Sequence, residues 1–557
     1  MQNQPAANRP RFFAAVRQNF ACIVASFVLV GITTIWFIGS YHGPEVVILD
    51  APANQFSAER AINELKTILG DRCAHEAGSQ ANFEVRDRLI ERIRFLGLEV
   101  QQTPFEVNGV KMCNLLTSIP GQQNTRPILL ATHYDSVEQG PGAGDAGSCV
   151  AALLEAARIL NNEYKSNDNQ QLSREVFFLF TDGEEWVRRI GHGLNGAIHF
   201  VETDPHPLLA RNPIILNFDA RGAAGPSLLY ETSSQNLKLI QHATAALPRP
   251  AFTASSYVTV YDLLPNATDF TIFKQAGLDG LNFAFIDDPH RYHTPGDTLA
   301  SLDPRCVQHH GENALALIHH LLKTDEQDFQ AKQNAVFFTV FNQSIICYPE
   351  KWAVGLAAAM LLLQLGGTWS CLRRGATTAE IFKTAVLVVL SLMLSLFAGW
   401  IVMQLDRHRI QSFHGFGPYD PWIVGLLWTC AVAAAVVLFS WLGRKISNES
   451  AWAAIWLGTA VVGLLVAVYL PGFSYLLLGL GLCPAALSFL PQDKAKLSVV
   501  AIAAASIFSI PLAYQFGIAL GPKMAMVLSA LFVLFLCPMV PLLTLQKTEG
   551  VREGQGR

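Results

Sequence analysis

Three carboxylates in four positions follow an apolar stretch in EVFFLFTDGEEW, which covers residues 175–186. Glu184 and Glu185 are adjacent, so they cannot project identically from regular structure. In such a doublet one carboxylate can bind a metal ion, while its neighbour faces the open coordination position and accepts a proton from the attacking water. The simpler interpretation is a solvated charged turn, but a turn does not need the long apolar run that leads into it.

Further candidate ligands follow other apolar runs. His133 and Asp135 lie two residues apart in THYDS, so in extended chain they point the same way, and the imidazole can bind metal while the carboxylate fixes its other nitrogen. Asp145 lies in GPGAGDAGS, where glycines allow close approach of the backbone. Taken alone, the first motif is more often a loop histidine beside a capping aspartate, and the second a helix N-cap.

Two later motifs extend this set. Asp219 ends the run PIILNFD, and His293 lies in DDPHRYHTPGDT together with a competing histidine, His290. We prefer His293 as the ligand because the turn that follows it is rigid and brings a carboxylate, Asp297, as a supporting group. Oxygen and imidazole ligands of this kind suit zinc or a comparable divalent ion.

These motifs are positioned by an alternation of strands and helices between residues 55 and 325. Apolar runs typical of strands buried on both faces alternate with helical stretches such as 148–162, and the runs lie at 127–133, 175–181, 213–219 and 281–286. The pattern predicts an α/β domain with a mostly parallel or mixed central sheet between helices. In open α/β sheets the site lies beyond the carboxyl ends of the strands, which is where the candidate ligands fall.

The rest of the chain is predicted to be an all-α multispan transmembrane domain with an N-terminal anchor. Of the 557 residues, 51% are hydrophobic, and an uncharged apolar run covers 20–38. Seven more spans are expected near 352–370, 384–404, 421–442, 451–469, 472–490, 497–516 and 524–545, with two of them separated at Pro471. We therefore expect a tail at 1–19, an anchor at 20–38, the α/β domain at 55–325, a linker at 326–351, the multispan domain at 352–545 and a tail at 546–557.

Basic residues indicate the orientation. With eight spans, thirteen Lys and Arg residues fall in the predicted inside segments, against three in the short outside loops. The positive-inside rule then places both termini in the cytoplasm and the α/β domain outside it. Because the sequence has no obvious eukaryotic insertion or retention signal, we expect a bacterial inner membrane with the α/β domain in the periplasm.

Net charge and cysteine spacing add little. A formal charge of −4 indicates no nucleic-acid partner, and ten scattered cysteines show no zinc-ribbon spacing and imply no disulfide framework. A bridge among Cys73, Cys113, Cys149 and Cys306 stays open if their part of the chain lies outside the cytoplasm. The expected partners are a peptide substrate and the lipid bilayer, and no oligomeric state is predicted.

The ordered motifs THYDS, GAGDAG, TDGEEW, NFDARG and YHTPGDT resemble the zinc aminopeptidase and glutamate carboxypeptidase group of co-catalytic metallopeptidases. The resemblance covers about residues 55–325 and implies two zinc ions per chain, which Asp145 bridges. It implies His133 and Asp219 as further ligands of one ion and Glu185 and His293 as further ligands of the other. It also implies Glu184 as the general base and Asp135 as the carboxylate that orients His133.

A closer resemblance is to the membrane-bound branch, of the endoplasmic-reticulum metallopeptidase and vacuolar membrane protease type, carried by 265–277 and 335–341. This chain departs from the usual continuation by inserting residues 186–190 before GHGLNGA, which affects the expected substrate pocket but no ligand. Asp219, where many carboxypeptidase members have glutamate, favours an aminopeptidase. Tyr257, Tyr261 and Tyr292 are candidates to bind the oxyanion, although packing is the commoner role of such tyrosines.

Two other functions fit the same motifs. A glutaminyl cyclase resembles this family but uses a single zinc ion to form N-terminal pyroglutamate. A receptor or scaffold on an inactive peptidase fold, as in relatives that resemble the transferrin receptor, is the non-enzymatic alternative, and the presence of all five ligands and the base counts against it.

Overall fold

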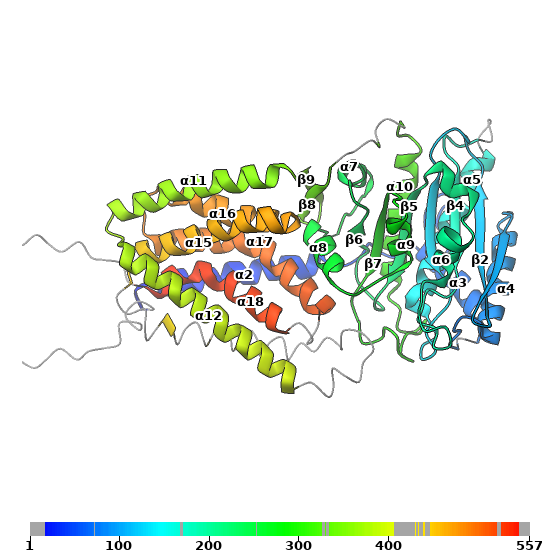
Figure 1. The fold of residues 1–557 in the computed structure, drawn as a ribbon, viewed down its shortest axis with the longest axis horizontal. Coiled ribbons are helices and arrows are strands. Elements are labelled where there is room, and N and C mark those ends of the chain that lie inside the picture. The colour runs from blue at the N-terminus through cyan, green and yellow to red at the C-terminus, as the bar shows by residue number, and fades with distance from the viewer. Residues whose placement is uncertain are drawn as a thin grey trace, which may run out of the picture. The chain divides into compact units, whose positions relative to one another are not determined.

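The computed structural model describes residues 17–71, 73–166, 171–251, 253–325, 329, 333–405, 446–520 and 525–544, with Thr429, Ala433, Leu438 and Phe439. It contains two compact units, an α/β unit at 40–350 and a helical unit drawn from 1–39 and 351–557. Their elements are labelled in Figure 1. The cysteines within the described residues are all unpaired.

A seven-stranded sheet organises the α/β unit in the order β1-β2-β4-β3-β5-β7-β6. The four neighbouring strands β4, β3, β5 and β7 are parallel, while β1, β2 and β6 run antiparallel to their neighbours. This is the mixed, mostly parallel sheet that the sequence predicts. The strands are β1 Gln101–Val107, β2 Val110–Ile119, β3 Ile128–His133, β4 Val176–Thr181, β5 Ile214–Ala220, β6 Leu228–Thr232 and β7 Gly280–Phe285.

Helices cover both faces of the sheet, which explains why the central strands are apolar throughout. All six residues of β3 and all seven of β5 are buried. One core joins the sheet to α3, α4, α5, α7 and α10, and a second joins the opposite face to α6 and α9. These helices are α3 Ala58–Leu69, α4 Gln80–Phe95, α5 Cys149–Ser166, α6 Asn195–Ile198, α7 Leu237–Ala246, α9 Asp269–Gln275 and α10 Pro304–Leu321, with α8 Ser255–Leu263 beside β6.

Local signals set several of these boundaries. The Ser57 side chain accepts a hydrogen bond from the Arg60 amide at the start of α3, and Gly70 ends that helix with a φ of +56°. Asp303 caps α10 in the same way, followed by Pro304 at the first helical position. Short irregular helices, η1 Ala143–Ser148, η2 His199–Thr203 and η3 Pro207–Arg211, complete the connections.

The segment expected to be a linker, 326–351, contains a β-hairpin within its described part. Strands β8 Ala335–Val340 and β9 Ser344–Pro349 pair antiparallel, and β8 packs beside α7 and α8. Val336 and Phe337 are fully buried. This stretch is therefore an element of the α/β unit.

The helical unit is built from long apolar helices. Six of those described are long and apolar enough to cross a membrane, namely Phe20–Ser40, Trp352–Arg373, Thr378–Gln404, Asn448–Tyr469, Lys494–Ala519 and Ala525–Leu543. A shorter apolar helix covers Pro471–Leu487, separate from the helix that ends at Tyr469. The span expected at 421–442 lies almost wholly outside the described residues. In Figure 1 the long helices are α2 Phe20–Ser40, α11 Trp352–Arg373, α12 Thr378–Leu405, α15 Asn448–Tyr469, α17 Lys494–Leu520 and α18 Ala525–Leu536, which is followed by η7 Cys537–Leu543. The short one consists of η5 Pro471–Phe473 and α16 Ser474–Leu487.

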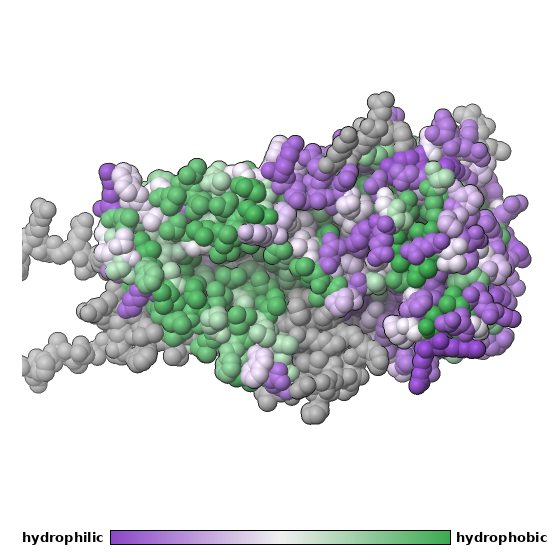
Figure 2. All heavy atoms as spheres, in the orientation of Figure 1, coloured by the Kyte–Doolittle hydropathy of each residue, from purple (hydrophilic) through white to green (hydrophobic). Residues whose placement is uncertain are grey.

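Side-chain exposure in the helical unit suits a lipid environment. On α12, Phe382, Met393 and Phe397 are each more than half exposed. Figure 2 shows hydrophobic side chains over the surface of these helices, and mostly hydrophilic ones over the α/β unit. Large exposed apolar surfaces of this extent are expected only where lipid or a partner covers them.

Candidate metal centre

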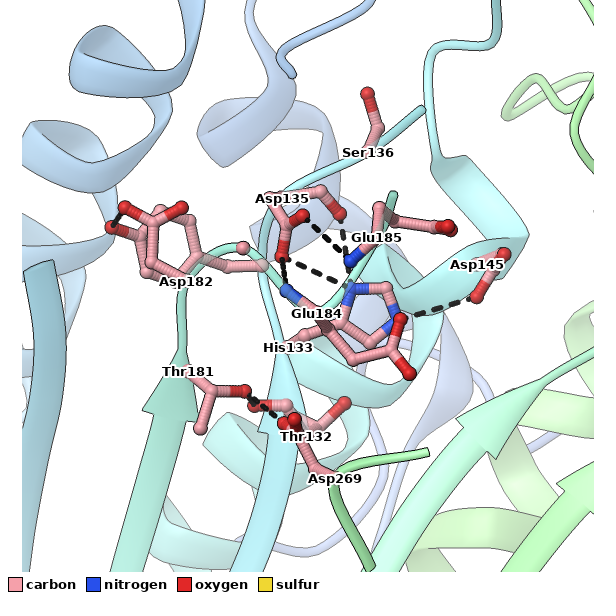
Figure 3. Close-up of polar contacts among 12 residues, drawn as sticks. Thr132, His133, Asp135, Ser136, Asp145, Thr181, Asp182, Glu184, Glu185 and Asp269 are labelled. Carbon is pink, nitrogen blue, oxygen red and sulfur yellow. Dashed lines mark hydrogen bonds and ion pairs between the residues drawn. The ribbon is translucent and has the colours of Figure 1, made fainter. Parts of the chain in front are cut away.

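The candidate ligands converge at the carboxyl edge of the parallel strands. His133 is the last residue of β3, Asp219 lies next to the end of β5, and Glu184 and Glu185 follow the end of β4 by three and four residues. Asp145 comes from η1, which precedes α5, and His293 from the loop after β7. Several of these side chains are drawn in Figure 3.

Asp145 occupies the centre of the cluster. Its Oδ1 lies 3.3 Å from His133 Nε2, and its Oδ2 lies 3.2 Å from His293 Nε2. His133 Nε2 is also 3.6 Å from Asp219 Oδ1, and His293 Nε2 is 2.9 Å from Glu185 Oε1. Each oxygen of Asp145 therefore faces a different histidine, and each histidine faces one further carboxylate.

The donors in the cluster fit divalent cations. His133 Nε2 is buried and has no hydrogen-bond partner among the described residues, although it faces two carboxylate oxygens. Four ligands about 2.1 Å from a zinc ion lie roughly 3.4 Å from one another in a tetrahedron, close to most of the separations observed here. Ligand atoms of His133, Asp145 and Glu185 all lie within 4.8 Å of one another. We therefore treat the cluster as a candidate metal site.

The close approach of charged groups in the cluster shifts the pKa values of its histidines and carboxyls. Burial alone would lower the pKa of His133, but the carboxylates of Asp135, Asp145 and Asp219 raise it well above its ordinary value. Burial raises the pKa of Glu185 to about 7 despite the nearby His293, whose own pKa rises to about 10 through Glu185 and Asp145. In the absence of a cation the cluster therefore retains protons that a bound cation would displace.

Asp135 makes contacts beyond the one expected of it. Its Oδ1 lies 3.5 Å from His133 Nδ1, but the same ring nitrogen is closer, at 3.1 Å, to the Asp135 backbone oxygen. The two carboxylate oxygens instead accept hydrogen bonds from the backbone amides of Glu184 and Glu185, each at 3.1 Å (Figure 3). Asp135 thus holds the glutamate doublet as well as the histidine.

The carboxyl of Glu184 lies among other charged groups of the cluster. Burial raises the pKa of its carboxyl well above the ordinary value, with Glu185, Asp219 and Asp269 adding to the rise and His133 opposing it. Its side chain is only partly buried, whereas Glu185 is 5% exposed. The two neighbouring carboxylates therefore differ in their access to solvent.

His293, which the sequence favours over His290, lies in the cluster. His293 has a φ of +57°, a left-handed conformation that is uncommon for this residue and often found at functional sites. The Tyr292 ring stacks on the His293 ring at 3.7 Å. His290, in contrast, is exposed and pairs with Asp288 at 2.8 Å.

Three buried carboxylates support the site from further out. Asp297, expected from the sequence, accepts hydrogen bonds from the amides of Gly144 at 2.6 Å and Asp145 at 3.2 Å. Sequence reasoning missed Asp182, which accepts from Asn82, the Cys113 amide and the Tyr134 hydroxyl.

It also missed Asp269, which accepts a hydrogen bond from Thr181. Asp182 directly precedes the TDGEEW glycine, so a buried carboxylate could have been suspected there. Asp269, at the start of α9, reads in the sequence as an ordinary first-turn residue.

A mostly parallel sheet whose carboxyl edge gathers two histidines and several carboxylates is the arrangement of an α/β metal-dependent hydrolase. Residues 114–318 match the model of Peptidase family M28. That stretch of the α/β unit is therefore similar to a family of metallopeptidases, and with its long apolar helices the chain is an integral membrane protein.

Curated proteins that are similar to this chain are named as proteases of a membrane compartment. The chain is 31% identical over 244 residues to Endoplasmic reticulum metallopeptidase 1 of Homo sapiens, an alignment covering 43% of this chain and 26% of that protein. It is 27% identical over 355 residues to the Vacuolar membrane protease of Candida tropicalis, covering 59% of this chain and 37% of that one. The chain thus spans well under half the length of these curated relatives.

Two solved structures are similar to about half of this chain at low sequence identity. An aminopeptidase from Aneurinibacillus sp. strain AM-1 is 13% identical, with 48% of this chain and 94% of that one covered and a TM-score of 0.39. A glutaminyl cyclase from an Acidobacteriales bacterium is 20% identical, with 51% and 99% covered and a TM-score of 0.38. At these identities neither likeness distinguishes hydrolysis from cyclisation.

Proposed function

We propose that this chain is a membrane-anchored, zinc-dependent exopeptidase, specifically an aminopeptidase that removes N-terminal residues from peptides. The observation that carries the proposal is the placement of Asp145 between His133 and His293, at 3.3 and 3.2 Å, with Glu184 beside them. A carboxylate shared between two imidazoles, each with its own second carboxylate, suits a pair of divalent cations.

These contacts support a proposal of two ligand sets. His133, Asp145 and Asp219 would hold one zinc ion, and Asp145, Glu185 and His293 the other. When bound, such a pair supplies Lewis-acid polarisation of the scissile carbonyl and lowers the pKa of a water molecule.

The residues of the chain contribute the proton transfers and the positioning. Glu184, partly exposed and next to the ligands, accepts the proton of the attacking water at its carboxylate and returns it to the departing amine. Asp135 holds the Glu184 and Glu185 amides and keeps this carboxylate in place. Tyr292, stacked on His293, fixes the orientation of that ring.

For location, we propose that the α/β unit lies on the non-cytoplasmic side of its membrane. The basic residues near the predicted inner ends of the spans support this orientation. The curated relatives named above come from human and Candida, so they lend no support to the bacterial inner membrane expected from the sequence, and the proposal is restricted to the side of the membrane.

Product analysis tests the activity. The purified full-length chain is incubated with three peptides that have a free N-terminus, a blocked N-terminus or an N-terminal Gln, with and without chelator, and the products are identified by mass. The proposal predicts chelator-sensitive loss of single residues from free N-termini. Formation of pyroglutamate without hydrolysis would assign the cyclase function, and no product from any peptide would assign a non-enzymatic one.

A further inference from the structure

A layer of buried polar side chains lies on one face of the sheet, next to the metal centre. Asn217 precedes Asp219 by two residues on β5, so both side chains project from the same face. Asn282 lies opposite Asn217 on the neighbouring strand β7. This face is the one that α9 covers, since Ile215 belongs to the same core as Phe270 and Phe273. Burying polar groups there is costly unless they meet partners.

The hydrogen-bond network determines which atom of Asn217 is left over. Glu231 is paired with Lys274 at 2.6 Å, so its carboxylate acts as an acceptor, and it receives the Asn282 Nδ2 group at 2.9 Å. Asn282 must therefore present its Oδ1 to Asn217, which donates from Nδ2 at 2.9 Å. The remaining atom, Asn217 Oδ1, is a buried acceptor with no partner among the described residues.

Two further oxygens on this side are buried and unsatisfied. Asp269 accepts the Thr181 hydroxyl at Oδ2, whereas its Oδ1 has no hydrogen-bond partner in the described part of the chain. The hydroxyl of Tyr261, whose ring packs edge-on against Tyr230 at 5.0 Å, is likewise unsatisfied there. Figure 3 shows the Asp269 carboxylate at the ends of β3 and β4, by Thr181 and Thr132.

These groups are near the reacting end of the site. Asn282, which contacts Asn217, also donates from Nδ2 to the Tyr230 hydroxyl at 2.7 Å and to Thr268 Oγ1 at 3.1 Å. Tyr230 packs against Tyr261, and Thr268 directly precedes Asp269. These contacts place Asn217, Tyr261 and Asp269 around one side chain, and Asn217 is two residues from Asp219 on β5.

We propose that Asp269, Asn217 and Tyr261 form a subsite that binds a primary ammonium group of the substrate. An ammonium has three N–H donors and no acceptor, which matches a carboxylate oxygen, an amide oxygen and a hydroxyl oxygen that lack donors. A free peptide N-terminus and a lysine side chain both carry this group. The inference rests on the proposed peptidase function, and it explains why a free N-terminus would be selected.

Binding measurements test the subsite apart from turnover. Full-length Glu184→Gln protein, loaded with zinc, is titrated by calorimetry with a lysine-free peptide, with its N-acetylated form, and with an N-acetylated peptide beginning with lysine. The titrations are repeated with Asp269→Asn added, which keeps an acceptor for Thr181 but removes the charge. Asp182→Asn serves as the matched control, because Asp182 is equally buried but all its contacts are satisfied by Asn82, Cys113 and Tyr134.

The subsite predicts that acetylation weakens binding and that Asp269→Asn weakens binding of the free peptide by about 10- to 100-fold, the loss expected for a hydrogen bond to a charged group. Asp182→Asn should leave the ratio between free and acetylated peptides unchanged. Tight binding of the acetylated lysine peptide would show that the subsite binds a lysine side-chain ammonium. Weak binding of that peptide would show that the subsite binds the α-ammonium of a free N-terminus. If Asp269→Asn alters neither affinity, or alters both equally, the subsite is wrong, even where the product analysis above shows hydrolysis.

Discussion

At the scale of single residues, Glu184 and Glu185 illustrate how adjacent identical side chains come to lie in different surroundings. Glu185 contacts His293 at 2.9 Å and is almost fully buried, while Glu184 is partly exposed. Their backbone amides share one acceptor, the carboxylate of Asp135. One aspartate therefore sets the position of both, and a change at any of the three tests the account.

Replacing the proposed base should separate chemistry from metal binding. Glu184→Gln keeps the size of the side chain but removes its ability to accept a proton, so we expect turnover to fall by about 10²- to 10⁴-fold. Metal content measured on the same preparation should stay at the wild-type value. Near-normal peptidase activity in this variant would refute the assignment of the base.

Removing the shared acceptor should affect both stability and rate. Asp135→Ala leaves the buried amides of Glu184 and Glu185 without their acceptor, at a cost of about 1–3 kcal/mol for each buried group. We expect a lower unfolding temperature and a loss of turnover. Asp135→Asn, which keeps one oxygen, should recover part of the stability. An unchanged melting temperature for Asp135→Ala would show that these hydrogen bonds do not contribute to stability.

At the scale of elements, the loop after β4 is held by close backbone packing. A Cβ added at Gly193 would lie 2.2 Å from the backbone oxygen of Glu184, which accepts a hydrogen bond from the Leu194 amide. At Gly191 nothing lies within 4 Å, although its φ of +90° also favours glycine. A substitution at Gly193 would therefore displace the loop, whereas a substitution at Gly191 would only strain the backbone.

We therefore expect Gly193→Ala to impair catalysis more than Gly191→Ala. The added methyl group must shift the Glu184 backbone, and misplacement of a catalytic group by about 1 Å can cost roughly 100-fold in rate. Gly191→Ala should lower stability through strain but keep a larger share of the activity per folded molecule. The kcat of each variant, corrected for the folded fraction by circular dichroism, provides the comparison, and equal kcat values would contradict this view of the loop.

Sequence patterns predicted the central strands because burial on both faces requires continuous apolar runs. β3, β4, β5 and β7 all show such runs, and each leads to or ends in a site residue. The edge strand β1 is mostly exposed and contains Pro104, so it gives no such signal. The sequence predicts a linker where the β8–β9 hairpin lies, because the alternation of its residues is short and lies beside a long apolar helix.

The sequence motifs point to the candidate ligands, which stay a prediction, but they do not reveal the groups that surround them. His133, Asp145, Glu185, Asp219 and His293 lie in motifs whose types and order are informative. Asp182, Asp269 and Asn217 act through contacts with residues 48–100 positions away, such as Tyr134, Asn82, Thr181 and Asn282. No local spacing reveals such contacts, because they depend on how the strands are ordered in the sheet.

At the scale of the whole molecule, the account requires the α/β unit to face away from the cytoplasm. Cys73 is an exposed free thiol in the described part of that unit. In sealed vesicles whose outer surface is the non-cytoplasmic face, a membrane-impermeant maleimide should label the chain without detergent, and Cys73→Ser should abolish most of that labelling. Labelling of Cys73 only after permeabilisation would reverse the proposed orientation.

The central claim is that the cluster around Asp145 holds two divalent cations that the activity requires. Its most direct test is the metal content of purified, active, full-length protein, measured by elemental analysis alongside peptidase turnover and compared with Asp145→Ala. The account predicts two zinc or equivalent ions per chain, loss of both activity and metal in the variant, and restoration of chelated wild-type protein by added zinc. Full turnover in a preparation with one divalent cation per chain or fewer would contradict it.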